Sequence, residues 1–210
     1  MSDDQNERTS KNLPATVNDD TAIANIAAIL QSEGGDEYMK FVKREYKKKG
    51  GVIIPLGTQF VAHVTQMKHG YVRFSDEGDL VERHVASMGN GQQPPDRSEL
   101  SNPELEGTEN DPYLFQYYLP MEEVETGDIL VFVTHTNGGK IALNRLMQKV
   151  VREKRGLPTI ALTVGEFPTK NFGMVPCPKF KIVGWEINDD AIIPPSGNGP
   201  KSSPNDTISF

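Results

Sequence analysis

The sequence predicts a β-rich α+β fold. Short segments of alternating apolar and polar residues follow one another between residues 52 and 133, a pattern typical of strands. A helical stripe then occupies about residues 139–155, and two more strand-like segments come after it. Hydrophobic residues make up only 36% of the chain, which indicates that part of its length lies in tails rather than in the core.

The first 20 residues are polar and aperiodic, so we expect a disordered N-terminal arm. The next stretch, "DDTAIANIAAILQSEGG", predicts a short helix capped at Asp20 or Thr21 and ended by Gly34 and Gly35. We expect a single β-rich domain over residues 21–186 and a flexible tail over residues 187–210.

Three strands are expected after residue 52, in the stretches "GTQFVAHVTQ", "YVRFS" and "LVERHVA". The connections "MKHG" and "DEGD" are short, which favours a three-stranded antiparallel meander. Alternation places Tyr71 and Arg73 on one face of the second strand and Phe74 on the other, so Phe74 is the expected core residue.

The segment 87–112 is rich in Gly, Pro and acidic residues, and we interpret it as a long loop. The stretches "YLFQYYLP" and "ILVFVTHT" then predict a hairpin at 113–136, in which Tyr113, Phe115 and Tyr117 share a face. Strand aromatics are usually buried, so we assign Phe115 to the core together with Phe132, Phe180 and Trp185.

The clearest helix has an apolar stripe of Leu143, Leu146, Met147 and Val150, and Gly156 follows its end. The last two strands are expected in "TIALTVGEF" and "KFKIVGWE". This order of elements fits an OB-like antiparallel barrel or curved sheet with the main helix before the last two strands. Another β-rich α+β domain is the alternative.

The sequence lacks the motifs that mark several classes of enzyme and metal site. The sequence contains neither a phosphate-binding GxxxxGK[ST] loop nor GxGxxG, and its four histidines lack the spacing of a zinc site. The single cysteine, Cys177, fits a reducing compartment, and the N-terminus lacks the pattern of a secretory signal, so we expect a cytoplasmic protein. We predict no catalytic residue, metal or cofactor.

The charge is distributed unevenly along this acidic chain, whose formal net charge is −7. The stretch "YMKFVKREYKKKGG" holds six bases and one acid, and residues 138–185 hold nine bases and two acids. Cations interleaved with aromatic rings are the ingredients of a single-stranded nucleic-acid site, where cations meet phosphates and rings stack on bases. The candidate residues are Tyr38, Lys40, Phe41, Lys43, Arg44, Tyr46, Lys47, Lys48, Lys49, Tyr71, Arg73, Lys140 and Arg145.

Two resemblances add to this interpretation. The chain ends in "NDTISF", and Asp206, Ile208 and Phe210 resemble the acidic, Phe-terminated tail of bacterial and phage single-stranded-DNA-binding proteins. That resemblance implies a tail that recruits replication or recombination proteins. The stretches "IPLGTQFVAHV", "RSEL", "DPYLFQYYLP" and "FGMVPCPKFKIVGWE" are similar to uncharacterised proteins of phages and prophages.

The leading hypothesis is a non-catalytic single-stranded-DNA-binding protein of phage or prophage type, acting in DNA replication or recombination in the bacterial host cell. One alternative is an accessory factor whose basic segments bind an acidic protein. Another is a metal-dependent nuclease that uses Asp96, Glu99 and Lys140. Homo-oligomer formation is left open.

Overall fold

The computed structural model describes residues 38–170 and 172–186. The chain divides into two units, Met1–Gly35 and Asp36–Phe210, and the described residues belong to the second. The predicted N-terminal arm, the helix expected at 19–35 and the C-terminal tail with Asp206, Ile208 and Phe210 lie outside the described residues.

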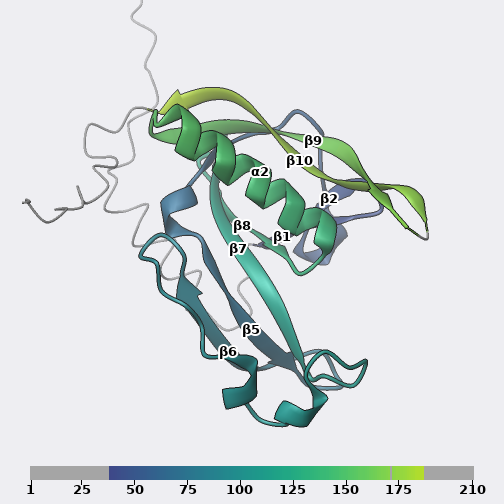
Figure 1. The fold of residues 1–210 in the computed structure, drawn as a ribbon. Helices are drawn as coiled ribbons and strands as arrows, with labels where there is room; N and C mark the ends of the chain where they lie inside the picture. The colour runs from purple at the N-terminus through teal and green to yellow at the C-terminus, as the bar shows by residue number, and fades with distance from the viewer. Residues whose placement is uncertain (1–37, 171, 187–210) are drawn as a thin grey trace, which may run out of the picture. The chain divides into compact units, whose positions relative to one another are not determined.

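Ten strands and one α-helix make up this part of the chain (Figure 1). Their bounds are β1 Tyr38–Val42, β2 Glu45–Lys48, β3 Ile53–Ile54, β4 Gln59–Ala62, β5 Lys68–Phe74, β6 Leu80–Ser87, β7 Tyr113–Glu123, β8 Ile129–Thr134, α2 Asn137–Glu153, β9 Leu157–Thr169 and β10 Gly173–Glu186. The main path of the sheet runs β10-β9-β4-β7-β8-β1-β2-β3, and β5 pairs with both β6 and β7. Every pairing is antiparallel except that of β1 with β8.

The sheet curls into a half-barrel, and α2 lies between β8 and the final hairpin β9–β10 in sequence. The prediction of a β-rich α+β, OB-like fold is therefore confirmed. The hairpin β7–β8 and the last two strands are also where the sequence placed them.

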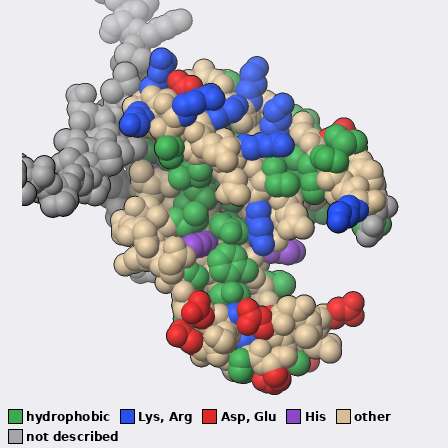
Figure 2. Space-filling view, viewed as in Figure 1, with side chains coloured by type: hydrophobic (Ala, Val, Ile, Leu, Met, Phe, Trp, Pro, Cys, Tyr) green, Lys and Arg blue, Asp and Glu red, His purple; other side chains and the backbone are tan. Residues whose placement is uncertain are grey.

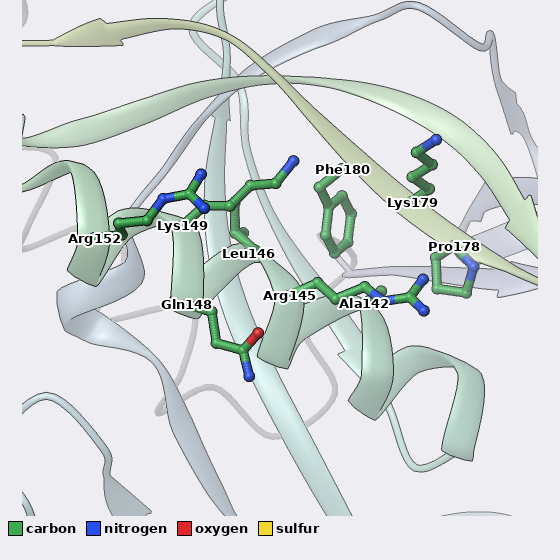
Figure 3. Close-up of a pocket in the computed structure, with 9 residues that line it drawn as sticks. All are labelled: Ala142, Arg145, Leu146, Gln148, Lys149, Arg152, Pro178, Lys179 and Phe180. Atoms are coloured by element: carbon green, nitrogen blue, oxygen red, sulfur yellow. The ribbon is translucent and has the colours of Figure 1, made fainter. Parts of the chain in front are cut away.

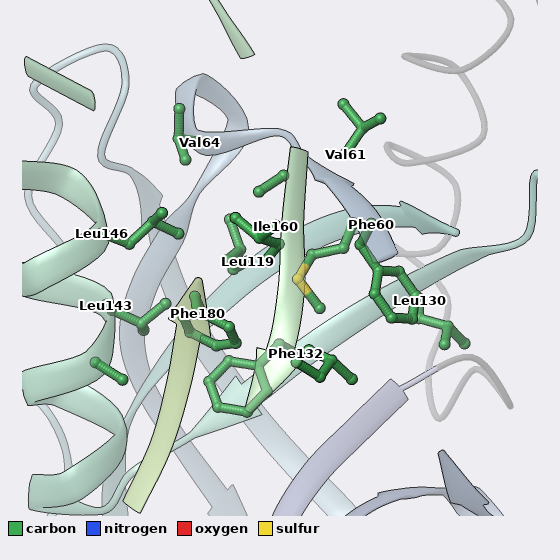
Figure 4. Packing of buried hydrophobic residues seen from close by; sticks show 14 of the residues in the cluster. Phe60, Val61, Val64, Leu119, Leu130, Phe132, Leu143, Leu146, Ile160 and Phe180 are labelled. Carbon is green, nitrogen blue, oxygen red and sulfur yellow. The ribbon is translucent and has the colours of Figure 1, made fainter. Parts of the chain in front are cut away.

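The core lies between α2 and the sheet (Figure 4). Leu143 and Leu146 of α2 approach Phe180 of β10, and Phe132 of β8 lies beside Phe180 with ring centroids 5.2 Å apart. Phe132 and Phe180 are buried as predicted, and Trp185 packs against the same cluster.

Helix α2 begins two residues before the predicted start because Thr136 caps it. The Thr136 hydroxyl accepts a hydrogen bond from the Gly139 backbone N–H at 3.1 Å. A Cβ on Gly139 would lie 1.9 Å from the Thr134 hydroxyl oxygen, so the absence of a side chain lets α2 start directly against the end of β8. The helix ends at Lys154, which adopts a left-handed conformation with φ 50°.

The predicted three-stranded meander is wrong. Strand β4 pairs with β7 and β9 and not with β5, and the 3-10 turn Val64–Gln66 separates β4 from β5. Three residues of "MKHG", Lys68–Gly70, belong to β5 itself rather than to a turn. Alternation identifies a strand but does not show which other strand it pairs with. Here Phe60 of β4 lies opposite Ile160 of β9, about 100 residues further along the chain.

Candidate nucleic-acid interface

The basic stretch at residues 38–51 contains the hairpin β1–β2. Lys40 lies opposite Lys47 on one face, and Phe41 lies opposite Tyr46 on the other. The hairpin therefore separates Lys40 and Lys47 from Phe41 and Tyr46, and leaves only the ring of Tyr38 on the face of Lys40.

The predicted stacking role of Tyr46 is wrong. Its side chain is fully buried, and its hydroxyl accepts a hydrogen bond from the Lys179 backbone N–H at 3.0 Å and donates to the Thr163 carbonyl at 2.9 Å. Burial raises the pKa of the Tyr46 phenol. Phe41 is half-buried with its ring 5.0 Å from that of Tyr46 and packs against the same core.

Acidic residues from distant segments neutralise part of the basic stretch. Arg44 pairs with Glu166 at 3.1 Å, and Lys48 lies 3.8 Å from Glu123. Lys47 pairs with its neighbour Glu45 at 2.9 Å. Lys43 is exposed in the turn, and Lys49 is exposed after β2. Such exposed pairs are weak, but they lower the net positive charge that this hairpin offers to phosphates.

Aromatic side chains gather instead on one face of the strands β5, β6 and β7. Pairing aligns His69 with Tyr117, and Tyr71 with both Phe115 and His84. The face continues the core-facing side of β7, but here Tyr71, His84, Phe115 and Tyr117 are partly open to solvent, whereas His69 and Tyr113 are buried. We call this surface the aromatic shelf and define it by His69, Tyr71, His84, Tyr113, Phe115 and Tyr117.

The rings of the shelf contact one another continuously. Phe115 lies 4.9 Å from Tyr71 and 5.3 Å from Tyr117, both edge to face. His69 packs on Phe115 at 5.7 Å, and His84 lies 6.1 Å from Tyr113. Tyr71, Phe115, Tyr117 and His84 are partly exposed, so Phe115 is not the core residue that the sequence predicted. Phe74, also expected in the core, is 39% exposed.

Cations border the shelf where it meets α2. The Lys140 ammonium lies 6.0 Å from the ring centre of Phe115 and 5.9 Å from that of Tyr117. Burial and the nearby charges of Lys40 and Lys140 lower the pKa of His135, which places these three side chains in one neighbourhood. Lys40 in turn lies over the ring of Tyr38 at 4.9 Å. We call Lys40 and Lys140 the cationic rim; His135 beside them is uncharged at neutral pH because its pKa is lowered.

The other end of the shelf meets the acidic loop at 88–112. Burial raises the pKa of Tyr71; the charge of Glu106 adds to that rise, Arg97 opposes it, and Asp111 and Asp96 make smaller additions. Arg73, a predicted phosphate contact, is paired with Glu82 at this end. The shelf therefore runs from a positive end to a negative one.

Arg145 does not share the site of Lys140. Five residues along an α-helix turn the direction of the side chain by about 140°. Arg145 faces β10 and lines a groove with Lys149, Arg152 and Lys179 (Figure 3). Figure 2 shows Lys and Arg side chains gathered over α2, Asp and Glu gathered at the opposite end of this part of the chain, and apolar side chains between them.

The structure thus brings together four predicted residues, Tyr38, Lys40, Tyr71 and Lys140, and separates them from Tyr46 and Arg145. Sequence reasoning missed five members of the shelf: His69, His84, Tyr113, Phe115 and Tyr117. The alternation in "YLFQYY" placed Phe115 and Tyr117 on one face, but it could not show that α2 leaves this face open.

No family model matches the chain, and neither a curated protein nor a solved structure matches it. Within the described ranges, no three His, Cys, Asp or Glu side chains cluster in a way that could hold a metal ion. A search of the same residues finds no helix with the length and apolar character needed to cross a membrane.

Proposed function

We propose that this protein binds single-stranded nucleic acid, with DNA as the expected ligand, along the aromatic shelf. The observation that carries the proposal is the unbroken run of partly exposed rings from Tyr71 through Phe115 to Tyr117, ending beneath the ammonium of Lys140. Stacking on such rings contributes roughly 1–3 kcal/mol per base and tolerates every base.

The two ends of the shelf differ in charge. Phosphates are attracted to Lys40 and Lys140 at the cationic rim and repelled by Glu106 at the other end. Unpaired bases cross the rings between these ends. A duplex keeps its bases stacked on one another and offers the shelf only its phosphates, so this arrangement favours single strands.

The cellular role in this proposal follows the sequence resemblance. The protein acts without catalysis in phage or prophage DNA replication or recombination, and Asp206, Ile208 and Phe210 contact partner proteins. An acidic protein partner is the second candidate, and the cationic groove between α2 and β10 favours it.

Removing a ring from the shelf is expected to weaken single-strand binding about tenfold. Tyr71→Leu and Phe115→Leu keep an apolar side chain but lose the stacking surface, which contributes roughly 1–3 kcal/mol per base. The measurement is fluorescence anisotropy of labelled oligothymidylate, with duplex DNA and single-stranded RNA in parallel. Phe172→Leu is the matched control, since that ring is 81% exposed and lies outside the shelf. Equal loss in all three variants, or no binding by the unaltered protein at low salt, contradicts the proposal.

Replacing Lys140 by glutamine is expected to remove one phosphate contact at the cationic rim. Affinity falls by a similar amount for every single-stranded sequence, and the slope of log K against log salt becomes shallower by about 1. The same anisotropy titration at several salt concentrations gives this slope. Lys170→Gln, an exposed lysine in the β9–β10 turn, is the matched control and leaves the slope unchanged.

A further inference from the structure

The groove between α2 and β10 combines four cations with an apolar floor (Figure 3). Its volume is about 240 Å³. Leu146 and Phe180 form the floor, and Arg145, Lys149, Arg152 and Lys179 surround it. The groove therefore fits a short segment that carries an apolar side chain between carboxylates.

These cations have little to neutralise them. Among the described residues, no carboxylate lies within ion-pair distance of Arg145, Lys149 or Lys179. Arg152 meets only its neighbour Glu153, at 3.4 Å and in an exposed position. The positive charge of the groove is thus open to a ligand from outside.

The chain itself presents a segment with the complementary pattern in the acidic loop. Leu105 lies between Glu104 and Glu106 in the 3-10 turn Pro103–Leu105, and both glutamates are exposed. The buried Arg97 fixes the start of this turn by donating to the carbonyls of Ser101 at 2.9 Å and Asn102 at 3.0 Å. The acidic segment is therefore held in one conformation before it meets a partner.

We propose that the groove of one copy binds the segment Glu104–Glu106 from the acidic loop of a second copy. Leu105 then covers Leu146 and Phe180, and the two carboxylates meet the arginine and lysine side chains around them. The groove and the acidic loop lie at opposite ends of this part of the chain (Figure 1), so the contact forms between molecules. Because it joins two different surfaces, it is satisfied by head-to-tail growth, by a closed ring, or by an antiparallel dimer in which each groove holds the loop of the other copy.

This inference does not rest on nucleic-acid binding. The groove lies on the flank of α2 that faces β10, and Lys140 lies on the flank that faces the shelf. Loss of one contact therefore leaves the other measurable.

Sedimentation velocity of the full chain, without nucleic acid and at increasing protein concentration, tests the contact. The unaltered protein is expected to associate at low salt and to dissociate as salt rises. The double variants Glu104→Lys/Glu106→Lys and Arg145→Glu/Lys149→Glu are each expected to lose association tenfold or more. Mixed together they are expected to associate again, because the intact groove of one variant meets the intact loop of the other.

Two further variants separate the contact from a general charge effect. Asp76→Lys/Glu125→Lys reverses two exposed acids outside the loop and is expected to associate like the unaltered protein. Leu105→Ser keeps both carboxylates and is expected to weaken association through the lost apolar contact. Circular dichroism confirms that each variant is folded.

A monomer at every concentration, or unchanged association after reversal of Glu104 and Glu106, overturns the proposal. Unchanged association after that reversal is also the result expected if another segment occupies the groove, such as acidic residues elsewhere in the chain. The anisotropy titration with oligothymidylate is run on the unaltered protein and on the groove variant Arg145→Glu/Lys149→Glu, whose substitutions lie outside the shelf and the cationic rim, so failure here and failure of nucleic-acid binding are told apart.

Discussion

Replacement of Tyr46 by alanine is expected to lower the free energy of unfolding by about 3–5 kcal/mol, the usual cost of emptying a buried aromatic site. The ring contacts Phe41 at 5.0 Å, Phe132 at 6.4 Å and Phe180 at 6.5 Å. Its hydroxyl also joins β2 to β9 and β10 through Thr163 and Lys179. Urea denaturation followed by circular dichroism measures the loss.

Two companion variants separate the ring from the hydroxyl and from a stacking role. Tyr46→Phe leaves the Lys179 N–H without its acceptor and is expected to cost about 1–3 kcal/mol. Tyr38→Ala, on the opposite face of the same hairpin, is expected to change stability by less than about 1 kcal/mol. A Tyr46→Ala variant of normal stability that has lost single-strand binding would contradict the structural role of this ring.

The local elements were predictable because periodicity is a local property. Alternation located β7, the continuous apolar run Ile129–Val133 located β8, and the stripe from Leu143 to Val150 located α2. The hairpin β1–β2 was not recognised, since its turn residues Lys43 and Arg44 have φ of 51° and 70° without the Gly or Asn that usually marks such a turn. The partners of β4 depend on contacts across the fold and have no local signal.

The site was only partly predictable for a related reason. A sequence shows which side chains share a face of a strand, but not whether another element covers that face. Tyr46 is covered by β9 and β10, whereas Phe115 lies where α2 no longer covers β7. Charge counts along the chain likewise missed that Glu166, 122 residues away, pairs with Arg44.

Replacement of Arg97 by methionine is expected to lower the midpoint of thermal unfolding by about 10 °C, because it leaves the Asp111 carboxylate without its partner. Arg97 is only 3% exposed, and its guanidinium pairs with Asp111 at 2.7 Å and lies 4.6 Å from the ring centre of Tyr113. Differential scanning calorimetry measures the midpoint. Arg44→Met removes an exposed pair with Glu166 and serves as the matched control, with an expected shift of about 2 °C or less.

The Arg97–Asp111 pair makes the stability of the protein depend on pH. Burial opposes ionisation of Asp111, but hydrogen bonds from Arg97 and from the backbone N–H groups of Tyr113 and Gly107 outweigh it and hold the pKa of the carboxyl below its usual 3.8. A carboxyl with a lowered pKa stabilises the fold fully above its unfolded-state pKa, and this contribution disappears as pH falls through the folded-state value. Asp111→Asn is therefore expected to reduce stability at neutral pH and to flatten its decline below about pH 4. The measurement is the midpoint of thermal unfolding of both proteins across this pH range. Curves that stay parallel for the unaltered protein and Asp111→Asn would show that Asp111 does not hold the loop through its charge.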